Sequence, residues 1–222
     1  MMRDTSGSSD ATRVWLFDLD NTLHDASPHI FPHINRSMTE YLMRHLALDE
    51  AGANALRIEY WHRYGATLLG LMRNHGTDAA HFLHETHQFP QLERMLVFNR
   101  ALAARLRHLP GRKVLFSNAP EAYARAVLRG IGLERCFERV FGIEQLGLQP
   151  KPQSESFRRV LHALRLPAHR CIMVEDTLPN LRAAKALGMR TVWVNRGSVR
   201  PACVDVKLRN ILDLRSAAHL VR

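Results

Sequence analysis

The chain has 222 residues, of which 46% are hydrophobic and 23% are charged, and it carries a formal net charge of +10. This composition is typical of one globular domain, or of one domain with a smaller appendage. No apolar run approaches the ~18 residues that cross a bilayer, so we expect neither a membrane-spanning segment nor a membrane partner.

The basic surplus can indicate a protein that binds nucleic acid, an anionic membrane surface or an anionic small molecule. The arginines are scattered along the chain, and they form no long block of like charges. Aromatic residues do not alternate with them, as a platform for stacked bases would require. We therefore expect no nucleic-acid partner, and a positive field that favours a small phosphate-bearing ligand.

Residues 1–12 contain no apolar stretch of the kind found in secretory signals, and we expect them to form a short disordered tail. The chain contains three cysteines, Cys136, Cys171 and Cys203, with no CxxC spacing. This odd number indicates reduced thiols rather than a disulfide framework. We expect a cytoplasmic protein, and the sequence does not indicate its oligomeric state.

The first predicted element is a strand over residues 14–17, VWLF, which runs directly into two aspartates, Asp18 and Asp20. Over residues 25–90 the apolar and aromatic residues recur at helical spacing, with no strand signal between them. They are Ile34, Met38, Tyr41, Leu42, Leu56, Tyr60, Tyr64, Leu68, Leu71 and Met72. Thr77 is a candidate N-cap for a last helix, which Pro90 closes. We predict an all-helical insert that acts as a lid.

The rest of the chain alternates strands and helices. A helix over 91–108 leads into the second strand, and further helices are expected over 121–132, 154–165 and 180–189. The later strands are expected at 113–116, 139–142, 171–174 and 191–194. This order predicts an α/β fold with a parallel sheet, in which residues 13–24 and 91–222 form the core and residues 25–90 form a helical cap domain inserted after the first strand.

Polar residues follow the predicted strands at their carboxyl ends, where open parallel sheets bind ligands. Asp18, Asp20 and Thr22 follow the first strand, and Ser117 and Asn118 follow the second. Glu175 and Asp176 follow the fourth, while Lys151 lies in the loop after the third. This collection is too acidic to hold an anion without a cation, and oxygen ligands suit Mg²⁺.

The segments DLDNTL, LFSN, PKP and VEDTLPN, in this order, resemble the four signature motifs of the haloacid dehalogenase (HAD) superfamily of phosphohydrolases. The resemblance covers residues 14–200 and implies a Rossmann-like core with a helical cap. It implies that Asp18 is the nucleophile that forms an aspartyl-phosphate and that Asp20 is the general acid and base. A true dehalogenase lacks an acid at the position of Asp20, so its presence favours a phosphate ester as the substrate.

The resemblance also assigns supporting roles. The magnesium ligands are expected to be the Asp18 carboxylate, the Asp20 backbone carbonyl and the Asp176 carboxylate. Ser117, the backbone around Asn118 and Lys151 are expected to bind phosphate, with Lys151 also neutralising charge on the transferred group. The residues expected to support these ligands from behind are Glu175, Asn180 and Thr22.

Within the insert, residues 57–76 and 81–87 resemble the cap of pyrimidine 5′-nucleotidases of the same superfamily. Tyr64 and Thr67 fall where a helix break can face the substrate, and His24 beside the nucleophile is a further candidate contact. His81, His84 and His87 recur every three residues, a spacing that drifts around a helix, so we interpret them as a solvated face rather than a metal site.

The resulting hypothesis is a Mg²⁺-dependent pyrimidine nucleoside 5′-monophosphate phosphatase of the cytoplasm. Three alternatives stay open. The first is a phosphatase of another small metabolite, such as phosphoglycolate or a sugar phosphate, and the second is a phosphomutase. The third is a non-enzymatic module of the same fold that binds phosphate or nucleic acid.

Overall fold

The computed structural model describes residues 13–221, and the tail predicted for residues 1–12 lies outside the described residues. Six parallel strands form one sheet in the order β3-β2-β1-β4-β5-β6. The strands are β1 (Val14–Phe17), β2 (Lys113–Phe116), β3 (Arg139–Phe141), β4 (Cys171–Glu175), β5 (Arg190–Val194) and β6 (Val206–Leu208).

The central strand β1 is buried on both of its faces. Trp15 and Phe17 belong to one hydrophobic cluster and Val14 and Leu16 to the other, and all four are fully buried. Strands of a parallel sheet that are covered on both sides carry continuous apolar runs, which explains the sequence VWLF. The predicted bounds of β1 and β2 therefore agree with the structure.

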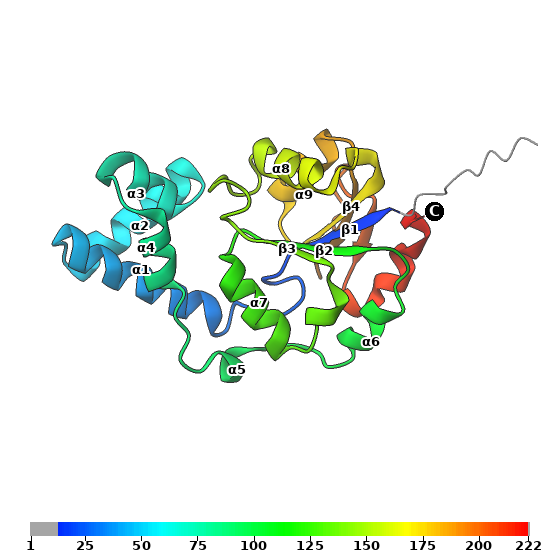
Figure 1. The fold of residues 1–222 in the computed structure, drawn as a ribbon, viewed down its shortest axis with the longest axis horizontal. Helices are drawn as coiled ribbons and strands as arrows, with labels where there is room; N and C mark the ends of the chain where they lie inside the picture. The colour runs from blue at the N-terminus through cyan, green and yellow to red at the C-terminus, as the bar shows by residue number, and fades with distance from the viewer. Residues whose placement is uncertain (1–12, 222) are drawn as a thin grey trace, which may run out of the picture.

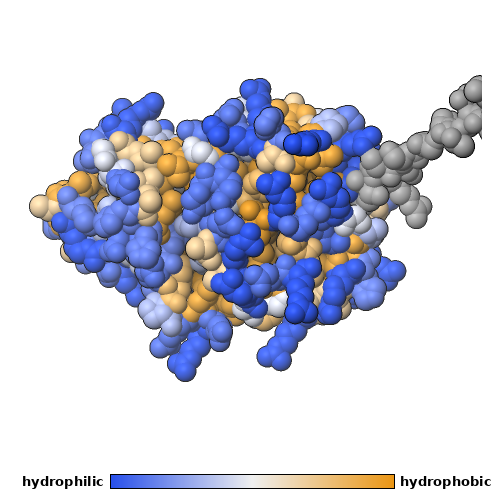
Figure 2. Space-filling view, viewed as in Figure 1, coloured by the Kyte–Doolittle hydropathy of each residue, from blue (hydrophilic) through white to orange (hydrophobic). Residues whose placement is uncertain are grey.

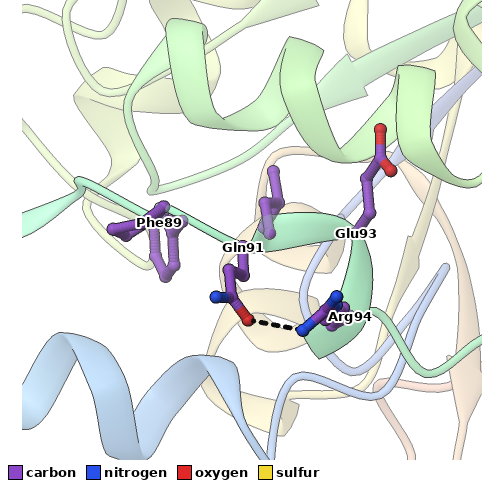
Figure 3. A pocket seen from close by; sticks show the side chains of 6 residues that line it. Phe89, Gln91, Glu93 and Arg94 are labelled. Atoms are coloured by element: carbon purple, nitrogen blue, oxygen red, sulfur yellow. Dashed lines mark hydrogen bonds between the residues drawn. The ribbon is translucent and has the colours of Figure 1, made fainter.

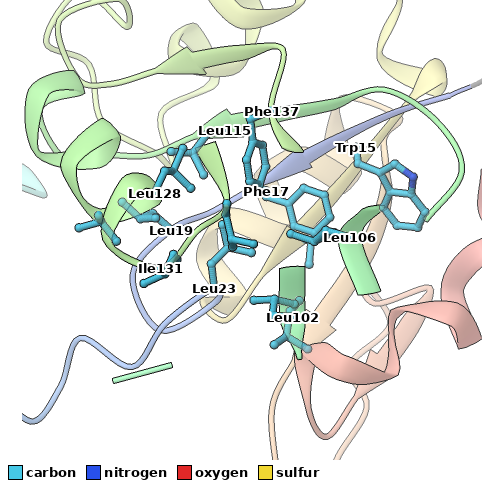
Figure 4. Packing of buried hydrophobic residues seen from close by; sticks show 14 of the residues in the cluster. Trp15, Phe17, Leu19, Leu23, Leu102, Leu106, Leu115, Leu128, Ile131 and Phe137 are labelled. Atoms are coloured by element: carbon cyan, nitrogen blue, oxygen red, sulfur yellow. The ribbon is translucent and has the colours of Figure 1, made fainter. Parts of the chain in front are cut away.

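Helices cover both faces of the sheet (Figure 1). One face packs against α6 (Leu102–Arg107), α7 (Glu121–Gly130) and the 3₁₀ segment η3 (Ile211–Val221). Figure 4 shows Phe17 and Leu115 of the strands beside Leu102, Leu106 and Leu128 of these helices. The opposite face packs against α8 (Ser154–Leu164) and α9 (Leu178–Ala186). These two layers confirm the predicted α/β parallel-sheet core.

The first four of the helices that follow β1 form a separate group at the left of Figure 1. They are α1 (Ile30–Leu46), α2 (Glu50–Tyr64), α3 (Thr67–His75) and α4 (Ala79–Thr86). The contact between α2 and α3 needs Gly70, because a Cβ there would lie 2.3 Å from the Tyr60 ring. The all-helical cap is confirmed as part of the fold, while the domain boundaries at 24/25 and 90/91 stay a prediction.

The cap's last helix begins with a different cap residue from the one predicted. Asp78, not Thr77, caps α4, since its carboxylate accepts a hydrogen bond from the His81 backbone N–H at 2.6 Å. A carboxylate at this position also interacts favourably with the positive N-terminal end of the helix dipole.

The prediction of one continuous helix over residues 91–108 is wrong. The structure has two short helices, α5 (Leu92–Met95) and α6, with an extended stretch between them. In that stretch the Val97 carbonyl accepts a hydrogen bond from the Asp25 backbone N–H at 2.8 Å, so the returning chain pairs with the outgoing one. This pairing outweighs the local helical spacing. The prediction also missed β6 and η3.

The strand order determines where a ligand can bind. Strand β2, the next along the chain, pairs with one edge of β1, and β4 pairs with the other edge. Such a reversal of strand order opens a crevice beyond the carboxyl ends of the strands. The end of β1 therefore lies between the ends of β2 and β4.

Figure 2 shows a face of the molecule on which hydrophilic side chains surround smaller apolar areas. Across residues 13–221, no helix has both the length and the apolar character that a membrane span requires.

Candidate active site

The loop after β1 turns through a left-handed residue. Asn21 has φ 61°, a conformation that asparagine adopts more readily than most residues. Its side-chain carbonyl accepts hydrogen bonds from the Ala26 N–H at 2.9 Å and the Ser27 hydroxyl at 3.1 Å. The turn thus closes the loop and fixes Asp18 and Asp20 at the carboxyl end of β1.

Lys151 lies at the centre of the site and is only 3% exposed. Its ammonium donates to Asp18 Oδ1 at 2.7 Å, to Glu175 Oε2 at 2.9 Å and to the Phe116 carbonyl at 2.8 Å. These acceptors come from the ends of β1, β4 and β2. All three ammonium protons are therefore used, and one cation joins the three neighbouring strands.

Asn118 holds the backbone of the lysine loop. Its amide nitrogen donates to the Lys151 carbonyl at 3.0 Å, and its amide oxygen accepts from the Lys151 N–H at 2.8 Å. The preceding Ser117 is buried, and its hydroxyl oxygen accepts from the Ala119 N–H at 3.1 Å. The predicted phosphate-binding residues Ser117, Asn118 and Lys151 thus lie together at the end of β2.

The Glu175 carboxylate is saturated with hydrogen bonds. Its Oε1 accepts from the backbone N–H groups of Asp176 and Thr177, both at 3.2 Å. Its Oε2 accepts from Lys151 and, at 3.0 Å, from the side-chain amide of Asn180. A carboxylate has about four acceptor positions, so Glu175 is a support for Lys151 rather than a free ligand. Asn180 thus lies beside Glu175, and its role as a support stays a prediction.

Three carboxylates crowd this site. One oxygen from each of Asp18, Glu175 and Asp176 lies within 4.8 Å of the other two. Burial, with the charge of Glu175, raises the pKa of Asp18 well above its usual range, and burial raises the pKa of Asp176 to about 7. Burial acts against the ionised form of Glu175 as well, but the nearby Lys151 holds the pKa of Glu175 below its usual range.

The donor set fits a hard divalent cation. Three carboxylates face a single ammonium, whose pKa is raised by Asp18 and Glu175 against the opposing effect of burial. The remaining negative charge and the all-oxygen ligands match what Mg²⁺ requires. Because Glu175 is saturated, Asp18 and Asp176 are the carboxylates left to coordinate a metal.

Asp20 is held at one oxygen by two side chains. The Tyr123 hydroxyl donates to Asp20 Oδ1 at 2.7 Å, and His24 Nε2 lies 2.9 Å from the same atom. His24 is buried, and its Nδ1 has no hydrogen-bond partner. The structure thus places His24 against Asp20. The Thr22 hydroxyl, also from this loop, is buried without a partner.

Tyr123 is a residue that the sequence analysis missed. It lies in α7, 103 residues beyond Asp20, and its only local signal is a place on the buried face of that helix. Burial and the charge of Asp20 raise the pKa of Tyr123 above its usual value, so the phenol stays protonated and donates.

The cap candidates Tyr64 and Thr67 bond within the cap. The Thr67 hydroxyl donates to the Arg57 carbonyl at 3.0 Å, and the Tyr64 hydroxyl accepts from the Asn74 amide at 3.1 Å. Within residues 13–221, neither side chain has a hydrogen bond to the residues at the sheet edge. The structure therefore does not join these two residues to the carboxylates.

The three cap histidines have different environments. His81 and His84 are exposed, as predicted. His87 is not part of that solvated face, because its ring lies 6.0 Å from the Tyr123 ring and 6.4 Å from the Phe89 ring. Burial lowers the pKa of His87 to about 4. The His87 side chain belongs to the packing between cap and core.

One surface pocket lies on the linker from the cap to the core. It is lined by residues 89–94, among them Phe89 and Glu93 (Figure 3). A hydrogen bond of 3.2 Å joins Arg94 to the Gln91 side chain within it.

Comparison with protein families matches residues 12–188 to the family described as haloacid dehalogenase-like hydrolase. Among curated proteins, the chain is similar to a phosphoglycolate phosphatase of Rhodospirillum rubrum, at 32% identity over 89% of this chain and 86% of that protein. A phosphoglycolate phosphatase of Colwellia psychrerythraea is 25% identical over 83% of this chain and 84% of its own.

Among solved structures, the fold resembles CbbY of Rhodobacter sphaeroides in complex with phosphate, with a TM-score of 0.63 and 20% identity over 91% of this chain and 96% of that one. It also resembles the HAD-hydrolase YfnB of Bacillus subtilis bound to magnesium, with a TM-score of 0.61 and 19% identity over 94% and 99% of the two chains. At this identity, the likeness concerns the fold.

Proposed function

The chain belongs to the haloacid dehalogenase-like hydrolase family, and from that premise we propose that it is a Mg²⁺-dependent phosphatase of pyrimidine nucleoside 5′-monophosphates. That it is a phosphatase of this family is supported by relatives of nearly its full length. The observation that carries the chemistry is the pair Asp18 and Asp20, one bonded to Lys151 and the other to Tyr123 and His24.

Asp18 is the proposed nucleophile. One of its oxygens attacks the phosphorus of the ester, a new P–O bond forms on Asp18, and the bond from phosphorus to the ester oxygen breaks. Asp20 donates a proton to the departing oxygen, which leaves as an alcohol. Asp20 then takes a proton from a water molecule, which attacks the aspartyl-phosphate and releases inorganic phosphate.

Lys151 and the groups after β2 stabilise the charge of the transferred phosphoryl group. The Lys151 ammonium already lies 2.7 Å from Asp18 Oδ1, close to where the phosphoryl oxygens must lie during attack. Ser117 and the backbone around Asn118 are the proposed hydrogen-bond donors to those oxygens. Fixed donors of this kind act strongly because they need little reorganisation during the reaction.

Asp18 and Asp176, with the Asp20 backbone carbonyl, are the residues that would hold Mg²⁺. The bound cation supplies positive charge that offsets the carboxylates and the phosphate dianion during transfer. Glu175, Asn180 and Thr22 are the proposed supports: the first two hold Lys151 and the β4 loop through recorded hydrogen bonds, and Thr22 lies buried in the nucleophile loop.

The substrate preference rests on the cap. Every phosphomonoester presents the same phosphate to the core, so discrimination must come from the groups that the cap adds when it closes. Tyr64 offers an aromatic face, and Thr67 offers a hydroxyl oxygen at the start of α3. The resemblance of residues 57–76 and 81–87 to pyrimidine 5′-nucleotidases supports a pyrimidine nucleotide, such as UMP or CMP.

Phosphoglycolate is the second candidate substrate, because both relatives described above are named phosphoglycolate phosphatase. The experiment is a panel of UMP, CMP, AMP, phosphoglycolate, a hexose phosphate and p-nitrophenyl phosphate, assayed for inorganic phosphate with Mg²⁺ and with EDTA. The nucleotidase proposal expects UMP or CMP to lead by about tenfold in kcat/KM. A tenfold lead for phosphoglycolate would replace it with the second candidate, and turnover of a sugar phosphate without release of phosphate would indicate a mutase.

A further inference from the structure

The hydrogen bonds of the Asp20 side chain are made at one oxygen. Among the described residues, Tyr123 and His24 both bond to Oδ1, and neither has a hydrogen bond to Oδ2. The Asp20 side chain keeps 16% of its surface exposed, whereas the His24 side chain has none. A carboxylate anchored at Oδ1 can rotate little about its own axis, so Oδ2 has a defined direction.

The two side chains bonded to Asp20 come from different parts of the chain. His24 lies on the same loop as Asp20, four residues further along, so its bond moves with the loop. Tyr123 comes from α7, which packs on the face of the sheet. The hydrogen bond from the Tyr123 hydroxyl therefore ties Asp20 to a separate element of the core.

The Tyr123 ring is in turn packed against the linker that joins cap to core. The Phe89 ring lies 5.1 Å from it with the planes 35° apart, and the His87 ring lies 6.0 Å away. Phe89 also lines the linker pocket in Figure 3. Ring contacts at these distances are typical of stabilising aromatic pairs. A movement of the cap that shifts this linker acts directly on the residue that holds Asp20.

We propose that Tyr123 is the positioning residue of Asp20, which aims Oδ2 at the leaving oxygen, and that Phe89 links this alignment to the position of the cap. This inference rests on the acid role proposed for Asp20, and it assigns to Tyr123 and Phe89 a function in catalysis beyond packing. Tyr123 acts through Asp20 and touches no reacting atom itself.

The experiment measures kcat/KM of Tyr123→Phe for two esters, p-nitrophenyl phosphate and the best alkyl phosphate of the panel. This parameter covers the steps up to formation of the aspartyl-phosphate, so the later hydrolysis does not enter. An alkyl alcohol leaves poorly without a proton, whereas p-nitrophenolate leaves well. We expect kcat/KM to fall about tenfold for the alkyl ester and less than about threefold for the aryl ester. Both losses are smaller than the roughly 10²–10⁴-fold contribution of a general acid, because Asp20 itself remains.

Two further measurements separate positioning from packing. In an Asp20→Asn background, Tyr123→Phe should cause no further loss, because the two residues act as one unit. Tyr41→Phe is the matched control, since it also removes a buried hydroxyl that bonds a histidine, His81, but within the cap. It should leave both esters unaffected.

Phe89→Leu keeps the Tyr123 hydroxyl and weakens only the ring contact, so it carries the test if Tyr123→Phe does not fold. We expect Phe89→Leu also to lower kcat/KM more for the alkyl ester than for the aryl ester, with a smaller loss than in Tyr123→Phe. Equal losses for both esters in these variants, or an undiminished loss on top of Asp20→Asn, would overturn the inference. An inactive wild-type protein would instead overturn the proposed function.

Discussion

The sheet edge and the cap differ in how their polar groups are joined. At the edge, Lys151 bonds residues from three strands, and the Glu175 carboxylate accepts four hydrogen bonds. In the cap, the candidate residues Tyr64 and Thr67 have their hydrogen bonds, among the residues that the structure describes, with neighbours on the cap helices. In the proposed function, the chemistry therefore belongs to the core, while selection of the substrate depends on how the cap is placed against it.

The largest effect is expected at Asp18. Asp18→Asn replaces the nucleophilic carboxylate by an amide, and no neighbouring group can take over the covalent intermediate. Turnover of every phosphomonoester should fall below detection, while the fold persists. Asp213→Asn is the control, since Asp213 is an exposed aspartate of η3. An Asp18→Asn enzyme within about tenfold of the wild type would disprove the assignment.

Metal removal is the next largest effect. EDTA should lower kcat by about a thousandfold, because a bound cation is worth several kcal/mol of charge stabilisation. Mg²⁺ should also raise the melting temperature, since a ligand at 100 times its Kd stabilises a protein by about 2.7 kcal/mol. Asp176→Asn should abolish this shift. The same shift in Asp176→Asn and in the wild type would place the metal elsewhere.

Asp20 should matter less than Asp18 and should depend on the substrate. In Asp20→Asn the nucleophile remains, so kcat/KM for an alkyl phosphate should fall by roughly 10²–10⁴ and for p-nitrophenyl phosphate by much less. Parallel assays of the two esters measure this difference. If both lose the same factor, Asp20 is not the acid for the leaving group.

The smallest effect is expected in the cap. Tyr64→Ala and Thr67→Ala should each reduce the preference for UMP over a hexose phosphate by about tenfold and spare p-nitrophenyl phosphate. Thr67→Ser keeps the hydroxyl that donates to the Arg57 carbonyl, and it serves as the matched control. Equal loss for all substrates would indicate that these residues only support the fold of the cap.

How much could be predicted from the sequence also differs between regions of the molecule. The bounds of β1 and β2 were predicted because each strand carries a short apolar run, VWLF in β1 and VLF in β2, and is followed directly by polar residues. The strand β6 was missed because it has three residues, of which Leu208 alone is buried. The break in the helix predicted over 91–108 depends on a backbone bond between Asp25 and Val97, which no local pattern reveals.

Most of the polar residues proposed for the core site lie at or just after the end of a strand, so a parallel sheet brings them to one edge. Lys151 is different, because it lies in the longer loop after β3 and reaches this edge through the path of that loop. Tyr123 could not be found in this way, since it lies within α7 and meets Asp20 only through the packing of that helix on the sheet. The position of His87 against Tyr123 likewise requires the path of the linker, which sequence spacing does not determine.

The central claim is that the sheet edge carries out phosphoryl transfer through Asp18. The most direct measurement uses the Asp20→Asn variant, in which hydrolysis of the intermediate is slowed, with p-nitrophenyl phosphate as the substrate. The reaction is quenched in acid, and the peptides are analysed by mass spectrometry. We predict one phosphoryl group on the peptide that contains Asp18, and none when Asp18 is also replaced by asparagine. Steady release of phosphate by wild-type protein with no labelled Asp18 peptide in the variant would contradict the account.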